Sequence, residues 1–100
     1  MIDLSDFEDV ARARLKDAIV LTFEDRYDGA IYLCGFAVEI AFKIKISKEN
    51  QLTQFPETDA EFKSFPVNKI KTHSLVHLRS LSPWIDKNLK IQRFQYQIVT

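Results

Sequence analysis

The sequence predicts an all-α protein, a compact bundle of four to five helices built around one long antiparallel helix pair. The 100 residues include only two glycines and three prolines, so long regular elements are expected. Apolar residues recur at spacings of three and four, which is the period of helices that bury one face. The first two periodic segments follow each other almost directly, and helices joined by short connections lie antiparallel in bundles. The length predicts one domain spanning residues 1–100.

The first helix is expected from about Asp6 to about Asp25. Ser5 and Glu8 have the spacing of a capping box, in which two side chains accept hydrogen bonds from each other's backbone N–H groups. Acidic residues in the first turn favour the positive end of the helix dipole. The residues expected on the buried stripe of this helix are Leu4, Phe7, Ala11, Leu15, Ala18 and Leu21.

The second helix is expected to follow Asp28 as its N-cap. Its apolar residues cover an arc wider than that of an ordinary surface helix, so it should be the central helix of the domain. Cys34 lies in this arc and is expected to be a small buried hydrophobe. As the lone cysteine, it excludes a disulfide framework and suits a reducing cytoplasm. The arc comprises Ala30, Leu33, Cys34, Ala37, Val38, Ala41 and Ile44.

The helical period fails between Ser47 and Lys71, where an asparagine and two prolines interrupt the pattern. Within this stretch, Thr58 and Glu61 have the spacing of a second capping box, which predicts one or two helical turns ending near Phe65. Aromatic side chains need burial, so the segment is expected to lie over the helical core. The three phenylalanines concerned are Phe55, Phe62 and Phe65.

A third, short helix is expected near Thr72. Ser82 followed by Pro83 predicts the start of another, because serine caps helices and proline suits the first helical position. The residues expected on the buried face are Leu75, Leu78, Leu81, Ile85, Leu89, Tyr96 and Val99, and those on a solvated basic face are Lys87, Lys90 and Arg93. An apolar seam of Ile91, Phe94 and Ile98 predicts self-association, as a dimer, through the C-terminal helix.

The charge balance and the sequence motifs exclude several classes of function. Fourteen basic side chains balance fourteen acidic ones, so no global field draws the protein to nucleic acid or anionic lipid. No secretion signal opens the chain and charges interrupt its apolar stretches, so a cytoplasmic protein without membrane association is expected. A phosphate loop and zinc-ligand spacing are both missing, and His73 and His77 lack a third ligand, so neither a cofactor nor a metal is expected.

One face of the second helix carries Tyr32, Phe36, Glu39 and Lys43, because their offsets of four, three and four residues keep them together. In one interpretation this face meets solvent, and the Glu39–Lys43 ion pair adds only roughly 0.3–0.5 kcal/mol to the stability of the fold. In the other, Glu39 is partly buried beneath Tyr32 and Phe36, and its carboxylate requires Lys43 and a further donor. His73 is the natural candidate for that donor.

Four fragments of the sequence, taken together, resemble the motifs of a known domain family. They are Tyr27-Asp28-Gly29-Ala30, the stretch from Gly35 through Glu39 to Lys43, Phe55-Pro56-Glu57-Thr58, and Thr72-His73-Ser74-Leu75. In this order, over roughly residues 8–81, they resemble the HEPN domain family. The resemblance implies a bundle of four or five helices, often a homodimer, that is short here at the C-terminus. Family members pair with minimal nucleotidyltransferases in toxin–antitoxin systems, serve in defence systems, or cleave RNA or bind RNA and nucleotides.

The arginine–histidine ribonuclease motif of the catalytic family members has no counterpart at His73 or His77, and His77 is expected to face solvent. The expected function is therefore a non-catalytic HEPN-like module that regulates or binds a nucleotidyltransferase-type protein or RNA, using Glu39, Lys43, His73 and Tyr32. One alternative is a ribonuclease toxin with His73 or His77 as general acid–base and a lysine as electrostatic clamp. Another is a structural dimerisation domain whose polar residues set only packing and register.

Overall fold

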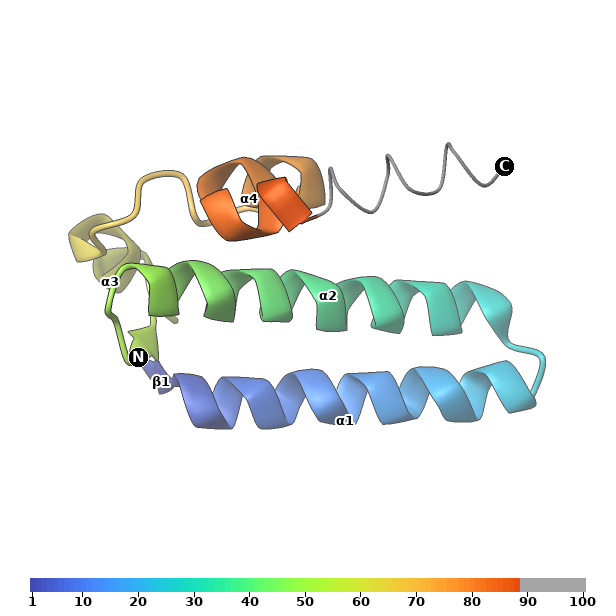
Figure 1. Ribbon diagram of the computed structural model, residues 1–100. Helices are drawn as coiled ribbons and strands as arrows, with labels where there is room; N and C mark the ends of the chain where they lie inside the picture. The colour runs from blue at the N-terminus through green and yellow to red at the C-terminus, as the bar shows by residue number, and fades with distance from the viewer. Residues whose placement is uncertain (89–100) are drawn as a thin grey trace.

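The computed structural model describes residues 1–88, which form a mostly helical domain (Figure 1). The elements, in chain order, are β1 (Ile2–Asp3), α1 (Leu4–Phe23), α2 (Tyr27–Glu49), β2 (Gln54–Phe55), α3 (Asp59–Ser64) and α4 (Leu75–Leu81), and residues 83–88 are again helical. The predicted long antiparallel helix pair is confirmed by α1 and α2. Figure 1 shows α4 along α2 on the side away from α1, so α2 is the central helix.

A tight turn joins α1 to α2. Asp25 adopts the left-handed conformation at φ 59°, and the Arg26 N–H donates to the Leu21 carbonyl at 2.8 Å, which closes the end of α1. At this end the helices approach closely, because a Cβ added to Gly29 would lie 3.2 Å from the side chain of Leu21. The turn leads directly into α2 at Tyr27, so the predicted N-cap, one residue later in the chain, is wrong.

The capping box predicted at Ser5 and Glu8 is also wrong, because α1 begins at Leu4, two residues before the predicted start at Asp6. The cause is tertiary: β1 pairs antiparallel with β2, and the Leu4 N–H donates to the Thr53 carbonyl at 3.0 Å. This pairing holds the backbone extended up to Asp3, which occupies the N-cap position. Both box residues therefore lie inside the helix, where Glu8 accepts a 2.8 Å hydrogen bond from an arginine side chain.

The hydrophobic core gathers where the open end of the α1–α2 pair meets the segment after α2. Phe55 stands at its centre, with ring centroids 5.0 Å from Phe7, 5.7 Å from Phe62 and 5.7 Å from Phe65. This confirms the prediction that the phenylalanine segment lies over the helices. The buried residues of the cluster are Leu4, Ile40, Ile44, Ile46, Phe55, Phe65, Ile70 and Leu78.

Two local predictions of helix starts are confirmed. The Thr58 hydroxyl accepts from the Glu61 N–H at 3.2 Å and the Glu61 carboxylate accepts from the Thr58 N–H at 3.1 Å, which is the expected capping box of α3. The Ser82 hydroxyl accepts from the Ile85 N–H at 3.1 Å and so caps residues 83–88. The helix expected near Thr72 begins three residues later, at Leu75, because Thr72 is held in a turn by the hydrogen bond from its N–H to the Ile70 carbonyl and Ser74 is the N-cap.

The burial of the apolar residues departs from the sequence prediction. Cys34 and Ala41 are exposed and Leu15 is 45% exposed, although all three were expected inside. The deepest positions of α2 are instead Ile40 and Ile46, both fully buried. The reason is that α1 and α4 flank α2 and the phenylalanine segment covers one face, whereas part of the wide apolar arc receives no cover from the described elements. The predictions for Leu89, Lys90, Ile91, Arg93, Phe94, Tyr96, Ile98 and Val99 lie outside the described residues.

Candidate functional site

The candidate site is a carboxylate on α2 that lies inside the protein with two donors directed at it. Glu39 Oε2 accepts a 2.9 Å hydrogen bond from Lys43 Nζ, and His73 Nδ1 lies 3.0 Å from Oε1 and 3.1 Å from Oε2. Only 9% of the Glu39 side chain and 8% of the Lys43 side chain are exposed. The interpretation in which this face meets solvent is therefore wrong for Glu39 and Lys43, and the predicted burial of Glu39 with Lys43 and a further donor is confirmed.

Local backbone geometry places these groups. One helical turn brings Lys43 over Glu39, since residues four apart lie on the same side of a helix. His73 lies 34 positions later in the chain than Glu39, in the irregular segment before α4. Burial of Ile70, which is 2% exposed, anchors that segment, and the Ser74 hydroxyl caps α4 by accepting from the His77 N–H at 3.2 Å.

The contact with Glu39 sets the tautomer of His73. A carboxylate can only accept hydrogen bonds, so the proton of the neutral imidazole lies on Nδ1 and Nε2 is left as an acceptor. The His73 side chain is 89% exposed, in contrast to its partner. The cluster thus joins a buried ion pair to an imidazole that faces outward.

Lys43 is held on two sides. Its Nζ lies 5.6 Å from the centroid of the Phe55 ring, within the range of a cation–π contact. Its carbonyl accepts a 2.8 Å hydrogen bond from the fully buried Ser47 hydroxyl. The amine faces Glu39 and the phenylalanine core, so its charge is balanced within the protein.

Two other predicted site residues lie apart from the cluster. Tyr32 is on α2 but is 75% exposed, so the expectation that it covers Glu39 is wrong. His77 is half-buried: its Nε2 donates to the Lys69 carbonyl at 2.9 Å, where Lys69 has φ 60°. His77 therefore holds the loop before α4. The prediction that it faces solvent is wrong, because its side chain is half-buried and hydrogen-bonded.

A lysine near the site is also paired. Lys71 Nζ donates to the carboxylate of Asp59 and lies 5.6 Å from the centroid of the Phe62 ring. The hydrogen bond from Lys71 holds the pKa of Asp59 below its ordinary value. Lys71 is therefore the basic group of an exposed ion pair beside α3.

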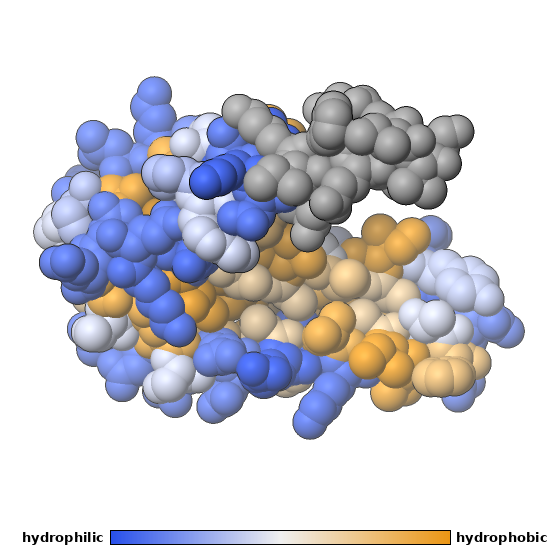
Figure 2. Space-filling model, viewed as in Figure 1, coloured by the Kyte–Doolittle hydropathy of each residue, from blue (hydrophilic) through white to orange (hydrophobic). Residues whose placement is uncertain are grey.

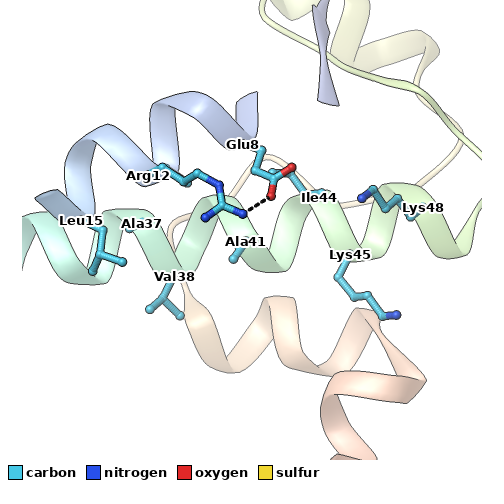
Figure 3. A pocket seen from close by; sticks show the side chains of 10 residues that line it. Glu8, Arg12, Leu15, Ala37, Val38, Ala41, Ile44, Lys45 and Lys48 are labelled. Atoms are coloured by element: carbon cyan, nitrogen blue, oxygen red, sulfur yellow. Dashed lines mark hydrogen bonds and ion pairs between the residues drawn. The ribbon is translucent and has the colours of Figure 1, made fainter. Parts of the chain in front are cut away.

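An exposed apolar surface on α1 and α2 is the main feature that sequence reasoning missed. Figure 2 shows apolar side chains gathered over the half of these helices nearest their connection. Along the α1–α2 groove runs a hollow of about 510 Å³, shown in Figure 3. It is lined by Glu8, Ala11, Arg12, Leu15, Ala37, Val38, Ala41, Ile44, Lys45 and Lys48. The wide apolar arc of α2 is the sequence signal for this surface, but an apolar arc predicts core and exposed apolar surface equally well.

Comparison with family models, curated proteins and solved structures found no match for this chain. Within residues 1–88, no group of three or more metal-ligating side chains comes together. None of the helices in the same range combines the length and the apolar character needed to cross a membrane.

The arrangement has two chemical capacities. The buried Glu39–Lys43 pair can hold His73 in one orientation, because the carboxylate accepts from a ring nitrogen while the amine balances its charge. The outward imidazole can accept a hydrogen bond or a proton at Nε2.

Proposed function

We propose that this chain is a non-catalytic helical module of the HEPN type that acts by binding. Its partner is a nucleotidyltransferase-type protein of a toxin–antitoxin or defence system. The observation that carries the proposal is the neutralisation of Glu39 inside the protein, with Lys43 at 2.9 Å and His73 at 3.0 Å. The negative charge of Glu39 is balanced within the protein by Lys43, so no substrate is needed to neutralise it.

The distribution of cations supports a binding role over cleavage of RNA. Phosphodiester cleavage needs a group that transfers protons and a cation that stabilises charge on the phosphate. The amine of Lys43 is 8% exposed and is directed at Glu39. Lys71 is paired with Asp59. Lys43 and Lys71, two lysines near His73, are thus already engaged by carboxylates.

The exposed groups near the cluster are suited to partner contact. His73 presents an imidazole whose orientation is set by Glu39, and Nε2 can accept a hydrogen bond from a partner N–H or hydroxyl. Tyr32 lies seven residues before Glu39 on the same helix, about 10 Å along its axis, and is 75% exposed. In this proposal Glu39 and Lys43 position the contact, and His73 and Tyr32 touch the partner.

The test is to read the neighbouring reading frame and, where it encodes a nucleotidyltransferase, to measure binding to that protein. The full chain should co-purify with that protein, and His73→Ala should weaken the complex by about tenfold while the chain remains folded. Lys16→Ala, an exposed change on α1, is the control and should leave affinity unchanged. Absence of a complex with the unaltered chain, or equal affinity for His73→Ala, would contradict the proposal. Binding of RNA alone would assign the site to RNA.

A second candidate, a ribonuclease toxin, is favoured by one observation. A carboxylate on Nδ1 of a histidine, as between Glu39 and His73, is the arrangement that prepares Nε2 to act as a general base. If this candidate were correct, expression would be toxic, purified protein would cleave RNA, and His73→Ala would abolish both effects. The binding module instead predicts no RNA turnover.

The third alternative is a structural domain whose polar residues set only packing. It predicts that His73→Ala and Tyr32→Ala leave the capture of every partner unchanged, since both side chains are exposed and contribute little to the core. The same binding measurement therefore separates it from the first proposal.

A further inference from the structure

The hollow between α1 and α2 in Figure 3 has two lysines at one end and apolar side chains at the other. Lys45 and Lys48 lie at the end formed by the last turns of α2, and Leu15 lies at the opposite end. Glu8 and Arg12 also line the hollow, but the Arg12 guanidinium donates to the Glu8 carboxylate at 2.8 Å, so these two charges balance each other. The net charge of the hollow is therefore positive and is concentrated at the lysine end.

The apolar part of this surface continues toward the turn between the helices. A second hollow, of about 320 Å³, shares Leu15 with the first and is lined in part by Ile31 and Cys34. Alanines leave this space open, because Ala11 on α1 and Ala41 on α2 line the first hollow with a single methyl group each. Volumes of about 510 and 320 Å³ lie within the range of small-molecule sites, about 300–1,000 Å³. The two hollows together form an elongated apolar surface with one cationic end, named here the α1–α2 trough.

Trp84 restricts the kind of ligand that fits the cationic end. Its ring centroid lies 4.5 Å from Lys45 Nζ, so the same chain already covers this end of α2 and another helix cannot lie along it. The trough stays open beside the ring, since Trp84 lines neither hollow. Lys45 keeps N–H donors for an anion, because an ammonium carries three and contacts the ring with one side. Lys48 is exposed and, within residues 1–88, forms no ion pair.

The chemistry of the trough matches a ligand with one anionic head and a single apolar tail. Lys45 and Lys48 are three residues apart on one side of the helix, where both ammonium groups can donate to one carboxylate. Cys34 lies eleven residues before Lys45, about 16 Å along the axis of α2. The bond length and angle of saturated carbon give an extended chain an advance of about 1.25 Å per carbon, so tetradecanoate spans about 16 Å and octanoate about 9 Å. The longer acid reaches the second hollow, and the shorter one ends within the first.

We infer that the α1–α2 trough is a binding site for a free long-chain fatty acid. The carboxylate binds at Lys45 and Lys48, and the chain lies along the alanine floor as far as Cys34. A bound chain covers apolar surface that soluble proteins rarely leave open. The cluster around Glu39 lines neither hollow, so this site is separate from the one in the proposed function and the inference does not depend on it.

The first experiment is a titration of the full chain with saturated fatty acids from octanoate to tetradecanoate, below the concentrations at which they form micelles. Trp84, the single tryptophan, reports binding through its fluorescence, because a carboxylate at Lys45 changes the charge beside the ring. Full burial of a methylene is worth about fourfold in affinity, and a chain in an open trough buries about half its surface, so affinity should rise about twofold per carbon. Tetradecanoate should therefore bind about 60-fold more tightly than octanoate.

Two further measurements test the head and the tail of the ligand separately. Decylamine, which carries a positive head, should bind at least about tenfold more weakly than decanoate, because two lysines face the head. Saturating tetradecanoate should slow alkylation of the exposed Cys34 thiol several-fold, since the end of the chain covers it, whereas saturating octanoate should not.

Two substitutions with matched controls test the position of the site. Lys48→Glu should weaken tetradecanoate binding at least about tenfold, and Lys63→Glu on α3, which makes the same charge change, should leave it unchanged. Ala41→Gln places a polar side chain on the floor of the trough and should weaken binding by a similar factor, whereas Ala60→Gln on α3 should have no effect. All four positions are exposed, so the variants should keep the fold, which circular dichroism verifies.

Three results would overturn the inference. One is no detectable binding of tetradecanoate at about 100 µM, the weakest affinity expected of a specific site for this chain. Another is decylamine that binds as tightly as decanoate, which would reduce the contact to non-specific burial of an apolar chain. The third is tetradecanoate binding that tolerates both Lys48→Glu and Ala41→Gln, which would assign the ligand to a different surface.

Discussion

Replacement of Glu39 by glutamine should cost this domain a large part of its stability. Glu39→Gln preserves the shape of the side chain but leaves the ammonium of Lys43, 8% exposed, without its counter-ion. Loss of one member of a buried ion pair costs about 3–5 kcal/mol, because the other charge stays desolvated. Domains of this size have unfolding free energies of about 5–15 kcal/mol, so the loss would be a third or more of a mid-range value.

The measurement is chemical denaturation followed by far-ultraviolet circular dichroism, which gives the unfolding free energy from midpoint and slope. The matched control is Glu8→Gln on α1. Glu8 forms a pair with Arg12 at the same four-residue spacing and a similar distance of 2.8 Å, but 46% and 71% of the two side chains are exposed. This control should cost no more than about 0.5 kcal/mol.

A double replacement separates charge from packing. Glu39→Leu combined with Lys43→Met removes both charges and keeps the volume, so its stability should lie near or above that of the unaltered chain. His73→Ala should cost less than about 1 kcal/mol, since the ring is 89% exposed. If Glu39→Gln were no more destabilising than Glu8→Gln, the argument that the pair is desolvated would be refuted.

Three further predictions concern local structure. Thr58→Ala should lower the unfolding free energy by about 1 kcal/mol through loss of the α3 cap, whereas Thr58→Ser should retain it in the same denaturation assay. Gln51, just after α2, has φ 60°, a left-handed conformation that glycine adopts without strain. Gln51→Gly should therefore raise the unfolding free energy by up to about 1 kcal/mol, while Gln51→Ala should not. The pKa of Asp59 is lowered by Lys71, so this contact stabilises the fold above the ordinary carboxyl pKa and is lost as pH falls below about 4. Nuclear magnetic resonance should give a lowered Asp59 titration midpoint that returns to the ordinary value in Lys71→Ala.

The helical class and the internal helix starts were predictable because their causes are local. The capping box at Thr58 and the cap at Ser82 each depend on hydrogen bonds spanning three residues, so the sequence pattern contains all the partners. The cap predicted at Ser5 failed because the start of α1 is set by the β1–β2 pairing, which joins residues more than 50 positions apart. The cap predicted at Asp28 failed for a local reason, because the turn after α1 is closed by Asp25 in the left-handed conformation, where glycine is the usual signal.

The candidate site was predictable in its chemistry but not in its surroundings. Glu39 and Lys43 are four residues apart on one helix, so their pairing follows from the helical period. A buried carboxylate with one amine has room for another donor, and His73 was the candidate for it. The exposure of Tyr32 and the cation–π contact between Lys43 and Phe55 depend on how distant segments cross α2, which the local pattern does not contain.

By itself, the sequence determined that the chain forms helices, where several of them begin, and which charged groups on α2 share a face. Those properties depend on interactions within a few residues. Only the tertiary structure decided which part of the apolar arc of α2 became core and which part, around Cys34, stayed exposed. That choice depends on where α1, α4 and the Phe55 segment pack, because burial depends on the elements that cover a residue, whereas periodicity shows only which residues share a face.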